Sequence, residues 1–76
     1  IPALTELRKA VAERLREDQL AGLVRSDIDP VAVAGGSVSI VMALLMAALQ
    51  FGTDGIDLHA HDIIAVLDAA VRPPQP

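Results

Sequence analysis

Two histidines and two aspartates lie close together in the last third of the chain, at Asp57, His59, His61 and Asp62. Imidazoles and carboxylates are the ligands that zinc prefers in proteins. Residues two apart on a helix point about 200° away from each other, whereas two ligands on one helix are usually three or four apart. The spacing therefore predicts solvated or locally hydrogen-bonded histidines and no bound cofactor, with a metal site shared with a partner chain as the alternative.

The other groups capable of chemistry form no catalytic pattern. The chain has no Cys, and Ser26, Ser37 and Ser39 are not placed beside a histidine by any local motif. Gly35-Gly36-Ser37 resembles part of a phosphate loop, but it lies inside a helical run and no Lys follows it. Asp27 and Asp29 are spaced for a cation, yet their position before a proline favours helix capping. We expect no enzymatic activity.

The composition limits the chain to one small domain that needs a partner. It has 76 residues, a net charge of −4, no Trp or Tyr and a single Phe, Phe51. Nucleic-acid binding needs a cluster of cations, and these features supply neither that cluster nor an aromatic platform. A domain of this size buries only about 60% of its unfolded surface and is marginally stable alone. With no disulfide available, a partner chain is the expected source of stability.

Helical periodicity predicts an all-α fold of three antiparallel helices over residues 3–21, 30–51 and 58–71. The first helix has one apolar stripe and a charged opposite face. The third is expected to begin after Asp57 as its cap. Lys9 and Glu13 have the spacing of a surface ion pair, as do other charged residues of the first helix.

The predicted helix ends depend on residues with strong local preferences. Pro2 suits a first helical position, and Gly22 suits the left-handed position after a helix end. Asp29-Pro30 combines a capping carboxylate with a residue whose backbone is already helical. Gly52 is expected to end the second helix.

The second helix is unusual because residues 30–53 contain no charged side chain. A helix that is apolar on all sides must be covered on at least two of them. Small residues recur every four positions along it, at Gly35, Ser39, Ala43 and Ala47. Such a row permits another helix to approach closely, either within the chain or across a twofold axis.

An alternative interpretation makes residues 30–53 a single membrane span. The segment is long enough to cross the hydrocarbon core, and small residues also mediate contacts between membrane helices. Its glycines, its serines and Gln50 dilute the hydrophobicity, and no Trp or Tyr marks an interface. We therefore expect no membrane association and a cytoplasmic location.

The run A-G-L-V-R-S-D-I-D-P over residues 21–30 is the most distinctive motif. With R-K-A-V-A-E-R-L before it and a long Ala-rich helix after it, the chain resembles the C-terminal domain of TetR/AcrR-like (tetracycline-repressor-like) bacterial transcription regulators. The resemblance covers nearly the whole chain. It implies that residues 1–72 are the C-terminal portion of an effector-binding and dimerisation domain, followed by a Pro-rich tail at 73–76. Because the chain begins at Ile1 without Met, we expect it to be part of a longer protein.

The resemblance also implies partners. DNA would be bound only through an N-terminal helix-turn-helix domain that this chain does not contain. Two copies would form a homodimer through a four-helix bundle of the second and third helices. The regulator would respond to an unknown small apolar effector. The alternative outside transcription is a plain helical protein-interaction module.

Two sets of residues follow from this interpretation. The expected dimer interface is Ser39, Ala43, Met46, Ala47, Ile63, Val66, Leu67 and Ala70. The expected part of the effector-pocket wall is Leu4, Leu7, Val11, Val38, Met42 and Leu45.

Overall fold

The computed structural model describes residues 1–74, and these form three helices without a strand. They are α1 (Pro2–Leu20), α2 (Pro30–Phe51) and α3 (Ile56–Val71). The predicted all-α class is confirmed. The last two residues of the expected Pro-rich tail, 75 and 76, lie outside the described part of the chain.

The end of α1 is set by a glycine. Gly22 has a φ of 78°, a left-handed conformation that is costly for residues with a Cβ. Its backbone N–H donates to the Gln19 carbonyl at 3.1 Å, and the Leu23 N–H donates to the Asp18 carbonyl at 2.8 Å. These two bonds form a Schellman motif, which satisfies carbonyls that the helix itself leaves unpaired.

The other helix ends follow the sequence with one correction. The Asp29 carboxylate accepts a hydrogen bond from the Val31 N–H at 3.0 Å, so the predicted cap of α2 is confirmed. Gly52, with a φ of 88°, follows the last residue of α2. The expectation that Asp57 caps α3 is wrong. The cap position is Gly55, which has a left-handed conformation. Asp57 lies in the first turn, where its negative charge interacts favourably with the positive end of the helix dipole.

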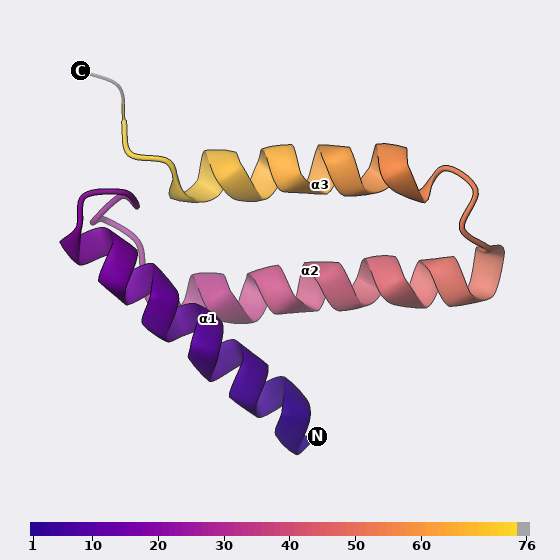
Figure 1. Ribbon diagram of the computed structural model, residues 1–76, viewed down its shortest axis with the longest axis horizontal. Helices are drawn as coiled ribbons and strands as arrows, with labels where there is room; N and C mark the ends of the chain where they lie inside the picture. The colour runs from indigo at the N-terminus through magenta and orange to yellow at the C-terminus, as the bar shows by residue number, and fades with distance from the viewer. Residues whose placement is uncertain (75–76) are drawn as a thin grey trace.

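The three helices form a flat molecule with extents of 40 × 33 × 14 Å. Figure 1 shows α2 and α3 side by side and antiparallel, while α1 runs obliquely across the beginning of α2. Residues of α2 contact both of the other helices. The predicted antiparallel arrangement is therefore found for α2 and α3, whereas α1 diverges from α2 along its length.

The buried core is small and consists of small side chains. Its apolar residues are Ala12 on α1, Val24 in the first loop, and Ala34 and Val38 on α2. Because alanine side chains are short, the helices come close where α1 crosses α2. No large side chain of the described residues is fully buried, so little hydrophobic burial holds the helices together.

Hydrogen bonds to the first loop tie all three helices together. The Gln19 side-chain amide donates to the carbonyls of Arg25 at 3.1 Å and Ile28 at 3.0 Å. The backbone N–H of Arg25 donates to the carbonyl of Val71, at the end of α3, at 2.8 Å. One half-buried glutamine thus fixes the loop from which α2 begins and on which α3 ends.

Replacing Gln19 with alanine should lower the free energy of unfolding by about 1–3 kcal/mol, because two loop carbonyls lose their donor. Urea unfolding followed by circular dichroism, at fixed protein concentration, measures the change. Glu17→Ala is the control, since Glu17 is exposed on the adjacent turn. An equal loss in both variants would contradict the role assigned to the amide.

Asp27 forms the second polar contact of the loop. Its two carboxylate oxygens accept from Arg25 Nε at 2.5 Å and Nη2 at 2.7 Å. The hydrogen bond from Arg25 is the main cause that lowers the pKa of Asp27 below its ordinary value. The same pair raises the pKa of Arg25.

Because the folded-state pKa of Asp27 is lowered, the pair stabilises the fold above the ordinary pKa of an aspartate, about 3.9. This stabilisation should disappear as the pH falls through the lower folded-state pKa. Thermal unfolding of the wild type and of Asp27→Asn, measured from neutral to acidic pH, should therefore converge at the acidic end. A constant difference between the two curves at every pH would rule out the ion pair as the source.

Candidate dimerisation surface

α2 and α3 lie side by side in one layer, and the two sides of this layer differ. On one side α1 contributes Val11 and Leu15 to an open apolar groove, which Leu67 and Val71 of α3 line from the other wall. The groove has a volume of about 280 Å³. On the opposite side no third helix lies over α2 and α3 within residues 1–74.

We call this opposite side the uncovered face. At 100° per residue, positions separated by four, seven and eleven residues share one side of a helix. The residues that define the face are Gly36, Ile40, Ala43 and Ala47 on α2, and His59, Ile63, Val66 and Ala70 on α3. Ile63 is half-buried and the other seven are exposed.

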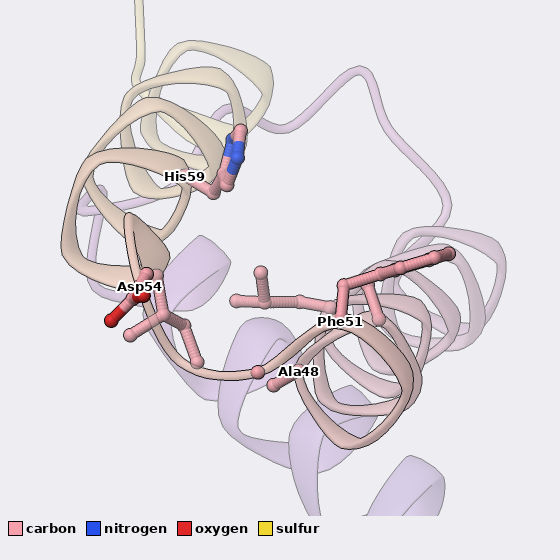
Figure 2. A pocket seen from close by; sticks show the side chains of 8 residues that line it. Ala48, Phe51, Asp54 and His59 are labelled. Carbon is pink, nitrogen blue, oxygen red and sulfur yellow. The ribbon is translucent and has the colours of Figure 1, made fainter.

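A hollow at the α2–α3 turn shows that the two rows belong to the same side. Ala47 and Phe51 of α2 and His59 of α3 all line it, and its volume is about 130 Å³. Figure 2 shows His59 on one side of the opening and Phe51 on the other, with the Asp54 carboxylate directed away from it. The hollow is therefore lined by apolar side chains of α2 together with two polar residues, Asp54 and His59.

The distribution of charge leaves the uncovered face neutral. None of its eight residues is an acid, a lysine or an arginine. Asp68 lines the groove on the α1 side, and Asp57, eleven residues before it, shares that side of α3. Asp62, which is exposed and lies four residues before Val66, borders the uncovered face on its other edge. The eight residues of the face therefore carry no charge of their own, and the nearest carboxylate of α3 lies at its edge.

The molecule exposes more surface than a folded monomer of its mass. A compact 8.0 kDa protein is expected to expose about 4,450 Å². This chain exposes 5663 Å², about 1,200 Å² more than that expectation. Much of the exposed surface is apolar: Val66 is 63% exposed and Met46 is 57% exposed. A specific dimer typically buries about 800 Å² on each partner, so the excess is sufficient for one interface.

The predicted interface residues lie on more than one side of the molecule. Five of them, Ala43, Ala47, Ile63, Val66 and Ala70, belong to the uncovered face. Ser39 instead lies near α1, where Arg8 Nη2 is 3.5 Å from its hydroxyl. Leu67 lines the groove on the α1 side, and Met46 is exposed on a neighbouring stripe of α2. The uncovered face also contains three residues outside the predicted set: Gly36, Ile40 and His59. On α2, Gly36 and Ile40 have the i, i+4, i+7, i+11 spacing with Ala43 and Ala47, and this spacing indicates that the four share one side of the helix.

The residues predicted to form an effector-pocket wall do not line one common cavity. Val38 is buried beneath α1, and Met42 is half-buried on the next turn. Leu4 is half-buried, whereas Leu7 and Leu45 are each 48% exposed. Of the six, Val11 lines the groove beside α3, and the other five line neither that groove, nor the hollow at the α2–α3 turn, nor the crevice between α1 and α2.

The two histidines lie apart, as expected for residues two apart on a helix. His59 lines the hollow of Figure 2, whereas His61 Nδ1 is 3.9 Å from the Asp62 carboxylate. Among the described residues, no three His, Asp or Glu side chains are placed to hold a metal ion together.

α2 is long and apolar enough to cross a membrane, with a mean hydropathy of 2.2, and only 11% of this stretch is buried. Its neighbours oppose a span in this arrangement. Arg8 Nη2 lies 3.5 Å from Ser39 Oγ, near the middle of α2, and Asp68 of α3 lines a groove that Ser37 of α2 also lines. A charged side chain at the bilayer centre costs about 3 kcal/mol or more.

Comparisons with protein-family models, with curated proteins and with solved structures find no match to this chain. The assignment of a function therefore depends on the geometry of the surface and on its chemistry.

Gly35, the glycine in the row of small residues on α2, provides a direct test of how closely α1 packs on α2. A Cβ added at Gly35 meets no atom within 4 Å, so α1 does not use the missing side chain for close approach. Gly35→Ala should raise the free energy of unfolding by about 0.5–1 kcal/mol, because alanine favours the helix. Urea unfolding measures the change, and a decrease would mean that another backbone occupies this space in solution.

Proposed function

We propose that this chain is a homodimerisation module in which the uncovered faces of two copies pack into a four-helix bundle of α2 and α3. The observation that carries the proposal is a surface without charged side chains over two antiparallel helices, in which four of the eight residues are glycine or alanine. A twofold axis pairs such a surface with itself, so one sequence supplies both halves of the interface.

Small residues make the proposed contact close. The α2 row of the uncovered face consists of Gly36, Ala43 and Ala47 around the larger Ile40. Short side chains permit the helix axes to approach, and Ile40 of one copy can then insert between small residues of the other. This packing would cover α2 on the side that α1 and α3 leave open.

We further propose that the module belongs to a TetR/AcrR-like regulator whose DNA-binding domain lies outside this chain. The support is the A-G-L-V-R-S-D-I-D-P run, which here forms the end of α1, the loop and the start of α2. In such a protein the bundle would hold two DNA-reading domains at a fixed separation, as half-sites about 34 Å apart require. The residues encoded upstream of Ile1 test this: a helix-turn-helix supports the assignment and any other domain contradicts it.

Dimerisation is tested by placing a charge on the uncovered face. The wild type should sediment near twice 8.0 kDa in detergent-free buffer. Ala43→Glu and Ala70→Glu should each prevent pairing, because a buried, unpaired carboxylate costs several kcal/mol. Sedimentation equilibrium measures the mass, and circular dichroism checks that the variants remain helical.

Ala10→Glu is the matched control for these variants. Ala10 is exposed on α1, and its side of the helix is turned away from the buried Ala12. The same substitution there should leave the dimer intact. A folded wild-type monomer, or dimers that persist in both face variants, would refute the proposed interface. A wild type that stays dispersed only in detergent would favour the membrane-helix alternative for α2.

A further inference from the structure

A second feature lies where α1 and α2 diverge, on the side of α2 away from the uncovered face. It is a crevice of about 260 Å³. We call it the α1–α2 crevice; its lining residues are Thr5, Arg8, Lys9 and Ala12 on α1, and Val31 and Gly35 on α2. Two adjacent cations thus stand at the edge of a space whose floor is made of alanine, valine and glycine.

Neither cation has a carboxylate partner among the described residues. Within residues 1–74 the ion pairs of arginine are those with Asp18, Asp27 and Asp68, and Lys9 does not form the pair with Glu13 that its spacing predicted. Arg8 instead extends across α2, with Nη2 3.5 Å from Ser39 Oγ. That hydroxyl already donates to the Gly35 carbonyl at 2.9 Å. Arg8 is therefore positioned over the crevice by a long contact to a neutral group, which leaves its charge available.

The floor of the crevice has room for an apolar body. Ala12 is buried, and Gly35 presents no side chain, with no atom within 4 Å of the position its Cβ would take. A cavity of about 150 Å³ accommodates benzene, so 260 Å³ has room for an apolar chain of about eight carbons. Apolar walls with a few convergent polar groups are typical of small-molecule sites.

We propose that the α1–α2 crevice binds a monocarboxylate with a short apolar chain, whose carboxylate lies between Arg8 and Lys9 and whose chain covers Ala12, Val31 and Gly35. Guanidinium and ammonium groups form charge-assisted hydrogen bonds with a carboxylate, and these are stronger than the contact of Arg8 with a neutral hydroxyl. The site uses only α1 and α2, so it stands whether or not the proposed dimer forms.

Octanoate is the probe, and 1-octanol is its matched neutral control. Titration of the full ¹⁵N-labelled chain, followed by amide chemical shifts, should place the octanoate shifts on the two walls of the crevice. Octanoate should bind at least about tenfold more tightly than 1-octanol, because the alcohol lacks the charge that Arg8 and Lys9 recognise. Equal affinities, shifts outside the crevice, or no binding at about 5 mM octanoate would each overturn the proposal.

Two variants test the two parts of the site. Arg8→Gln should weaken octanoate binding by about tenfold, whereas Arg16→Gln, which removes the same charge from an exposed position of α1, should change it by less than about twofold. Gly35→Leu should abolish binding by filling the floor while its amide spectrum remains that of a folded chain. Equal effects of the two arginine variants, or unchanged binding in folded Gly35→Leu, would refute the site. Sedimentation of the same samples reports dimerisation separately, so a failure of one proposal is distinguishable from a failure of the other.

Discussion

The physical constraint on which this structure depends is the need to cover α2. A helix of 22 residues without a charged side chain has no side that water solvates well. α1 covers only its beginning, because the two helices diverge after crossing near Ala12 and Ala34. α3 covers a second side. The third side, opposite α1, stays open over its whole length and continues onto α3.

The helix ends were predictable because the interactions that set them are local. Asp29 caps α2 through a bond to a residue two positions away, and Gly22 and Gly52 adopt positive φ angles that other residues rarely take. The predicted start of α3 is wrong because two nearby residues both have a local preference for a helix start. Asp57 is a good capping residue, but the helix begins two residues earlier than expected, with Gly55 at the cap position. A carboxylate in the first turn is also stabilised by the helix dipole, so Asp57 suits either position.

The partition of side chains between surfaces was predictable only in part. Periodicity groups Ala43 with Ala47, and Ile63 with Ala70, but it does not reveal which stripe a neighbouring helix covers. That choice depends on where α1 crosses α2 and on how the loop holds α3. A glutamine amide and one backbone bond from Arg25 to Val71 set these positions, and no sequence pattern identifies them. Leu67 was therefore grouped with the interface, although it belongs to the groove beside α1.

The α1–α2 crevice and the uncovered face lie on opposite sides of one helix, and this restricts how they could communicate. Coupling requires that a ligand bind the paired and unpaired chains with different affinity. α2 is a continuous helix in Figure 1, and the residues that line the α1–α2 crevice include none of those that define the uncovered face. The element that such a ligand would move is α1, which is held to α2 mainly by small side chains and by the long Arg8–Ser39 contact. The start of α1 is its end farthest from the loop that Gln19 fixes, so a change in crossing angle produces its largest displacement there. Any domain attached before α1 would follow that displacement relative to α2 and α3.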